Sequence, residues 1–113
     1  MSSNAPAPRF MQASLRISVV FCALAAAHSA SAQDRSLIEA GAEVYKTHCA
    51  ECHGERLVST GSTFDLRRLR ADERPRFDKA TAEGKGQMPA WGGVLSAEEF
   101  DRLWAYIRSK ADD

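Results

Sequence analysis

The sequence is poor in cysteine, in long hydrophobic runs and in net charge. Only three of its 113 residues are cysteines, and 15 basic residues balance 15 acidic ones. This balance argues against a general attraction to nucleic acid. The longest apolar run, Ile17 to Ala27, is shorter than the roughly 20 residues that a membrane-spanning helix needs. We therefore expect no nucleic-acid partner and no membrane anchor.

The short apolar run has the features of an export signal. Arg9 and Arg16 precede it, and Ala30-Ser31-Ala32 follows it as an A-x-A cleavage sequence. The pattern predicts a cleaved signal peptide over residues 1–32 and a single domain over residues 33–113, located in the periplasm. Translation from Met11 instead of Met1 would give a more compact signal, and the sequence leaves both starts open.

The cysteines do not form a disulfide framework. Cys22 falls inside the signal, and Phe21 stands before it where a lipid attachment site needs a small residue. A disulfide between Cys49 and Cys52 would close too short a loop to stabilise a domain. So small a domain buries only about 60% of its unfolded surface. We therefore expect this pair to bind something that reinforces the core.

Three helical segments are expected, with no alternating strand pattern between them. The first spans Ser36 to Cys49, and Ser36-Leu37-Ile38-Glu39 is a capping box. Gly41 would permit close approach of another helix. One apolar stripe follows at helical spacing: Ile38, Ala42, Tyr45 and Cys49.

The other two helices are marked by their ends. A weaker helix is predicted from Asp72 as N-cap to Glu83, with Pro75 in its first turn and Gly84 as its stop. The last helix begins at a second capping box, Ser96-Ala97-Glu98-Glu99, and has Lys110 in its last turn. Its buried face is expected to contain Phe100, Leu103, Trp104 and Ile107.

Cys49-Ala50-Glu51-Cys52-His53 is a C-x-x-C-H motif, the attachment pattern of c-type haem. Two thiols on one helical turn can each bond a porphyrin vinyl group, and the adjacent His53 then becomes the proximal iron ligand. The motif predicts one haem c, covalently attached through Cys49 and Cys52. Export agrees with this reading, because the attachment is made outside the bacterial cytoplasm.

Two other uses of a C-x-x-C pair fit less well. A structural zinc site needs four ligands, and His48 adjoins Cys49 too closely to join His53 on the same ion. A thioredoxin-like redox pair belongs in a strand–helix context, which this sequence lacks.

Met88 is the only methionine after the predicted cleavage, and we expect it to be the sixth iron ligand. It lies in a loop, where Gly84 and Gly86 allow a tight path and Pro89 fixes the backbone. A thioether opposite histidine raises the reduction potential. The alternative is a methionine that fills a gap in the core.

The chain resembles class I cytochromes c from Ser36 to Lys110. The resemblance rests on Gly41-x-x-x-Tyr45 before the C-x-x-C-H motif, the loop Gly86-Gln87-Met88-Pro89-Ala90-Trp91, and Leu103-Trp104-Ala105-Tyr106-Ile107. It implies an all-α fold of three to four helices around one haem, with first and last helices crossing at Gly41 and Tyr106. Trp91 is then either a donor to a haem propionate or a core residue.

One feature departs from this family. Many members place a proline soon after the motif, and its carbonyl accepts the ring N–H of the proximal histidine. Glu55-Arg56-Leu57-Val58 contains no proline, so the acceptor for His53 is unassigned, although one is expected.

The resemblance implies a one-electron carrier, not an enzyme, that connects a periplasmic dehydrogenase with a terminal oxidase or another cytochrome. The segment from Phe64 to Phe77 and the Met88 loop most resemble cytochromes that serve quinoprotein alcohol dehydrogenases. Alternatives are a haem sensor or small peroxidase with a labile sixth ligand, and a fixed subunit of a larger enzyme. A basic stretch is either a solvated face, a docking site for an acidic partner or a propionate neutraliser: Arg67, Arg68, Arg70, Arg74, Arg76 and Lys79.

Overall fold

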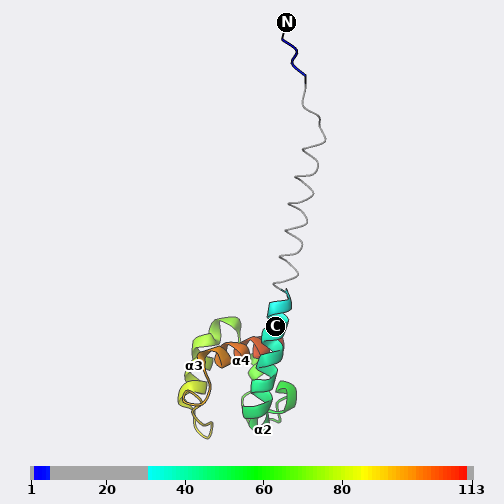
Figure 1. Cartoon of the computed structure of the whole chain (residues 1–113). Coiled ribbons are helices and arrows are strands. Elements are labelled where there is room, and N and C mark those ends of the chain that lie inside the picture. Colours follow the sequence, from blue (N-terminus) through cyan, green and yellow to red (C-terminus); the bar gives the residue numbers. More distant parts are fainter. Residues whose placement is uncertain (1, 6–30, 112–113) are drawn as a thin grey trace. The chain divides into compact units, whose positions relative to one another are not determined.

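The computed structural model describes residues 2–5 and 31–111 (Figure 1). The chain divides into two compact units, residues 1–34 and residues 35–113. Most of the expected signal peptide lies outside the described residues, so the cleavage after Ala32 stays a prediction. None of the helices in the described ranges combines the length and apolarity needed to cross a bilayer.

The described residues form helices, turns and loops, without a strand. Residues 31–48 are helical, and the short α2 (Ala50–His53) follows after a break at Cys49. The longer helices α3 (Arg74–Glu83) and α4 (Ala97–Ser109) come later in the chain. Three 3₁₀ turns connect these elements: η1 (Glu55–Leu57), η2 (Leu66–Arg68) and η3 (Ala71–Glu73). The expected all-α class is confirmed.

Two expected helix starts are wrong. Residues 31–35 are already helical, so Ser36 lies inside the first helix and does not begin it. No glycine or proline in residues 31–35 stops the helix there. Asp72 lies in η3, and Glu73 is the N-cap of α3. Asp72 is bonded to Arg70 instead, which leaves it no capping role in α3.

Two other helix signals are confirmed. Ser96 caps α4 in a complete capping box, because its hydroxyl accepts the Glu99 N–H and the Glu99 carboxylate accepts the Ser96 N–H. Gly84 ends α3 with a φ of 80°, a conformation that side chains strain to adopt. Lys110, which was expected in the last turn, is instead the C-cap of α4, and Arg108 is the basic residue of that turn.

The core lies where the first helix, residues 35–48 of the second unit, crosses α4 (Figure 1). A Cβ placed on Gly41 would lie 1.9 Å from the Arg102 carbonyl oxygen and 2.9 Å from Cβ of Tyr106, so the two backbones touch here. The rings of Tyr45 and Tyr106 pack beside this crossing, 5.4 Å apart. The largest fully buried side chains are Tyr45, Leu57, Leu103 and Ile107.

Candidate haem attachment site

The C-x-x-C-H motif forms one helical turn at the end of the first helix. The Cys49 N–H still donates to the Tyr45 carbonyl (2.8 Å), while the His53 N–H donates to the Cys49 carbonyl (2.9 Å). Cys49 and Cys52 are three residues apart, a spacing that puts both on one side of the turn. Both cysteines are free; Cys49 is buried and Cys52 is exposed.

The buried cysteine belongs to the hydrophobic core. Its burial, with a smaller effect from the neighbouring Cys52, raises the pKa of the Cys49 thiol to about 11. The thiol is therefore held neutral against Tyr45 and Ala50, which lie in the same cluster. Cys52, three residues later on the same side of the turn, lies at the edge of this cluster and is exposed.

The chain turns sharply after the motif. A Cβ on Gly54 would lie 1.9 Å from the Val58 carbonyl oxygen, and Gly54 has a φ of 90°. Arg56 and Leu57 also have positive φ, at 52° and 64°, which non-glycine residues rarely adopt. The turn is held because Leu57 is buried and the Tyr45 hydroxyl donates to the Gly54 carbonyl at 2.6 Å. Burial raises the pKa of that phenol.

His53 ends α2, and one edge of its ring is bonded to the loop that follows. The Thr63 hydroxyl oxygen lies 3.3 Å from His53 Nδ1 and 3.2 Å from the Cys52 carbonyl oxygen. Burial lowers the pKa of His53, whereas a hydrogen bond with the Phe64 backbone raises it. Thr63 and Phe64 therefore supply the partners that the missing proline left unassigned.

The Met88 loop is a tight turn on the end of α3. Lys85 and Met88 exchange both backbone hydrogen bonds, at 3.1 and 3.0 Å. The Trp91 N–H donates to the Thr81 carbonyl at 2.8 Å, and the Gly92 N–H to the Ala82 carbonyl at 3.1 Å. Met88 itself is half-buried. Backbone hydrogen bonds thus hold the loop on both sides of Met88.

A ring contact connects this loop with the motif. His48, the residue before Cys49, packs on Trp91 with ring centroids 5.0 Å apart and planes inclined by 59°. Trp91 comes three residues after Met88 and is half-buried. The contact brings the Met88 loop to the beginning of the C-x-x-C-H turn. Trp91 therefore packs against a side chain, and its bond to a propionate stays a prediction.

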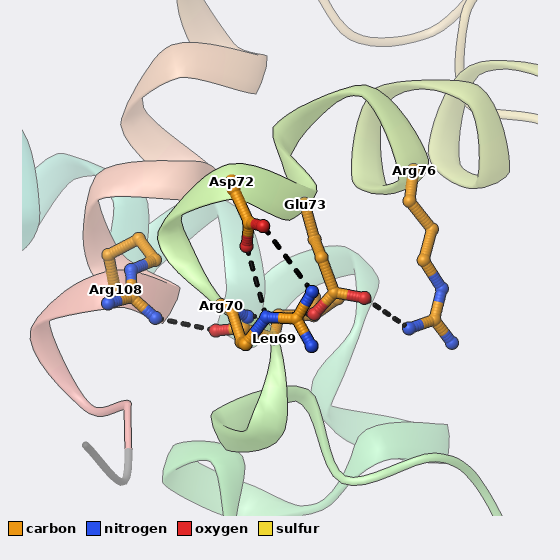
Figure 2. Close-up of polar contacts among 6 residues, drawn as sticks. All are labelled: Leu69, Arg70, Asp72, Glu73, Arg76 and Arg108. Atoms are coloured by element: carbon orange, nitrogen blue, oxygen red, sulfur yellow. Dashed lines mark hydrogen bonds and ion pairs between the residues drawn. The ribbon is translucent and has the colours of Figure 1, made fainter.

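The basic stretch is largely neutralised within the chain. Figure 2 shows part of this network, where Arg70 meets Asp72, Arg76 meets Glu73, and Arg108 donates to the Leu69 carbonyl. Arg68 and Arg70 are exposed, which leaves them accessible at the surface. Carboxylates pair with four of the arginines: Arg67 with Asp65, Arg70 with Asp72, Arg74 with Asp78 and Asp101, and Arg76 with Glu73.

Sequence reasoning missed His48 and Thr63 as parts of this site. His48 was considered only as a poor zinc ligand, because a sequence does not show that Trp91 lies beside it. Thr63 follows a run of loop residues, and nothing in the local pattern separates its hydroxyl from the others. A search for any acceptor near His53 could have included it, since metal-binding imidazoles nearly always donate their second N–H.

The residues present fit a haem bound by two thioethers. Two free thiols lie one helical turn apart, and the adjacent imidazole has its Nδ1 edge bonded, which leaves Nε2 as the remaining nitrogen. A histidine and a methionine form the ligand pair of low-spin cytochromes c. Among the described residues, no cluster of three histidine, cysteine or acidic side chains could hold a metal ion.

Comparison with known proteins identifies the family. The model of the family described as cytochrome C oxidase, cbb3-type, subunit III, matches residues 36–107. The quinohemoprotein alcohol dehydrogenase ADH-IIG of Pseudomonas putida is 33% identical over 86 residues, which cover 74% of this chain and 12% of that enzyme. The chain thus spans only a small part of this relative.

Two further relatives are cytochromes c6. That of Microcystis aeruginosa is 32% identical over 77 residues, covering 64% of this chain and 95% of its own length. The chloroplastic cytochrome c6 of Chlamydomonas reinhardtii is 36% identical over 94 residues, which cover 77% of this chain and 62% of that protein. No solved structure gives a significant match. The chain belongs to the family of the cbb3-type subunit III cytochromes and is a class I c-type cytochrome with one haem c, bound covalently through Cys49 and Cys52.

Proposed function

We propose that this cytochrome is an exported one-electron carrier, not an enzyme, with His53 and Met88 as the two axial ligands of its iron. The observation that carries the proposal is the joint arrangement of two segments. His53 is bonded through Nδ1, so Nε2 is the nitrogen left for a metal, and the His48–Trp91 contact brings the Met88 loop to the same motif. If His53 and Met88 both held the iron, no position on it would be left for a substrate.

The haem supplies the redox chemistry, a one-electron change between the ferric and ferrous states. The protein's residues hold and shield it. Cys49 lies against the core and fixes one side of the attachment, while Thr63 and Phe64 orient the imidazole of His53. Gly84 gives the Met88 loop its close path, because a Cβ there would lie 2.8 Å from the Met88 carbonyl oxygen.

The partners that we propose are a periplasmic dehydrogenase as donor and an oxidase or another cytochrome as acceptor. A quinoprotein alcohol dehydrogenase is the favoured donor, since the chain is similar to 12% of the length of a quinohemoprotein alcohol dehydrogenase. The paired arginines favour a structural role for the basic stretch over a docking role. Electron-transfer rates that fall with added salt, and fall again in the Arg67→Ala, Arg68→Ala double variant, would restore the docking role.

A sensor or peroxidase would need Met88 to leave the iron easily. The structure favours a held loop, because Lys85 and Met88 bond each other and Trp91 and Gly92 bond the end of α3. The purified, haem-loaded protein tests this directly. We expect a ferric far-red absorption band from methionine sulfur that disappears in Met88→Ala, and a reduced protein that binds carbon monoxide slowly. A high-spin native spectrum with rapid carbon monoxide binding would favour the sensor or peroxidase.

A further inference from the structure

The environment of His53 contains a hydroxyl group whose two hydrogen bonds determine which ring nitrogen carries the proton. The Thr63 oxygen lies within hydrogen-bond distance of both the Cys52 carbonyl (3.2 Å) and His53 Nδ1 (3.3 Å). A threonine hydroxyl has one hydrogen to donate and two lone pairs to accept. The carbonyl of Cys52 can only accept, so it takes the single hydrogen of Thr63.

The second contact must then run in the opposite direction. Because the Thr63 hydroxyl donates its hydrogen to the Cys52 carbonyl oxygen, it can only accept a hydrogen bond from the ring. His53 Nδ1 must therefore carry the ring proton. A neutral imidazole has one proton, and Nε2 therefore has a free lone pair. In the reverse arrangement Thr63 would donate to Nδ1, which would leave the proton on Nε2 and the Cys52 carbonyl without this hydrogen bond.

Thr63 is the residue whose side chain lies at the Nδ1 edge of the ring. The next residue, Phe64, also makes a backbone hydrogen bond with His53. One short segment therefore holds the imidazole.

The loop before Thr63 holds it in place. The Ser59 hydroxyl accepts the Gly61 N–H at 3.2 Å and donates to the Thr63 carbonyl at 3.5 Å. Gly61 has a φ of 85°, which lets the chain turn back. The loop thus folds on itself and presents the Thr63 side chain to the end of α2.

We propose that Thr63 is a positioning residue that fixes the proton of His53 on Nδ1 and so prepares Nε2 to bind the haem iron. This inference rests on the proposed role of His53 as the proximal ligand. An acceptor on the far nitrogen makes an imidazole a stronger ligand. Thr63 therefore stabilises the ferric state more than the ferrous state, and its loss raises the reduction potential.

The test compares Thr63→Val and Thr63→Ser with the haem-loaded wild-type protein. Valine keeps the shape and removes the hydroxyl, whereas serine keeps the hydroxyl. Ser62→Ala is the matched loop control, because the Ser62 hydroxyl is exposed and bonds Thr60 instead of the ring. Two quantities are measured: the reduction potential, and the solvent-exchange rate of the His53 Nδ1 proton by NMR of the ferrous protein.

We expect a higher potential and at least tenfold faster exchange of the Nδ1 proton in Thr63→Val, with wild-type values in Thr63→Ser and Ser62→Ala. Wild-type potential and exchange in Thr63→Val would overturn the inference. The same spectra separate this inference from the proposed function. If the far-red band is absent while the Nδ1 proton behaves as expected, Met88 fails as a ligand and Thr63 does not.

Discussion

His48 and Trp91 pack ring against ring, with centroids 5.0 Å apart, although 43 positions of the chain separate them. The first precedes the haem-binding turn, and the second follows the Met88 loop. The contact therefore crosses between the two segments that are proposed to supply the axial ligands. Its contribution to holding them together can be measured.

We expect His48→Ala to loosen the Met88 loop, because the loop then loses its aromatic contact with the motif. Aromatic pairs contribute about 0.5–1.5 kcal/mol beyond their buried area. An increase of roughly threefold to tenfold in the rate at which cyanide binds the ferric protein is the expected result. His48→Phe keeps the ring contact and is the control, with a rate close to that of the wild type. Equal rates in all three proteins would show that backbone hydrogen bonds alone hold the loop.

Gly41→Ala should strongly destabilise the fold. The added methyl group would lie 1.9 Å from the Arg102 carbonyl oxygen, and a backbone atom cannot move aside as a side-chain end can. The two helices must separate, which should lower the free energy of unfolding by at least the ~1–3 kcal/mol that overpacking commonly costs. The midpoint of denaturant unfolding measures this loss of stability.

Gly93→Ala is the matched control for Gly41→Ala. A Cβ on Gly93 would meet no atom within 4 Å, and the residue has no positive φ. We expect an unchanged or slightly higher unfolding midpoint, because alanine restricts the unfolded chain more than glycine does. A Gly41→Ala protein as stable as this control would contradict the helix crossing.

Arg74→Ala should weaken the contact between α3 and α4. The guanidinium pairs with Asp78 at 2.7 Å and with Asp101 at 2.8 Å, and it lies 5.7 Å from the Trp104 ring centroid. Partly exposed pairs contribute about 0.2–1 kcal/mol and a cation–π contact about 0.5–1 kcal/mol. We expect a loss of about 1–2 kcal/mol in the free energy of unfolding, with the ion-pair part decreasing at high salt.

Arg70→Ala provides the comparison for Arg74→Ala. The side chains of Arg70 and Asp72 are 71% and 72% exposed, so their pair is screened by water. We expect no measurable change in the free energy of unfolding. If both variants lost the same free energy of unfolding, the contact of Arg74 with α4 would stabilise the fold no more than an exposed surface ion pair does.

Glu99 should contribute to the loss of folding stability at low pH. Its hydrogen bonds from the Ser96 backbone and side chain, with a smaller effect of His48, lower its pKa below the ordinary value of 4.5. A pKa that is lower in the folded state gives stability above the ordinary value, and this stability is lost as the pH falls through the folded value. Glu99→Gln should therefore flatten the fall in thermal stability below about pH 4.5. If the thermal stability of Glu99→Gln fell at low pH as steeply as that of the wild type, Glu99 would not contribute to the acid sensitivity.

The sequence by itself determined the chemistry and the helical ends that depend on neighbouring residues. Haem attachment through Cys49 and Cys52, with His53 as the proposed iron ligand, needs all three residues on one helical turn, so their spacing points to them without a tertiary structure. Ser96 and Glu99 cap α4 through bonds three residues apart, and Gly84 ends α3 through its own backbone freedom. The capping box at Ser36 predicted the wrong helix start, because such a box begins a helix only where the residues before it are not helical, and residues 31–35 are helical.

The tertiary structure decided the contacts between distant segments. His48 becomes part of the site because the Met88 loop folds back onto α3 and carries Trp91 to it. Thr63 becomes a partner of His53 because the turn at Gly54 brings the following loop against the end of α2. Likewise, the arginines read as a basic patch in sequence, yet Arg74 pairs with Asp101 from another helix. Such contacts depend on how the chain turns, which local residue patterns do not encode.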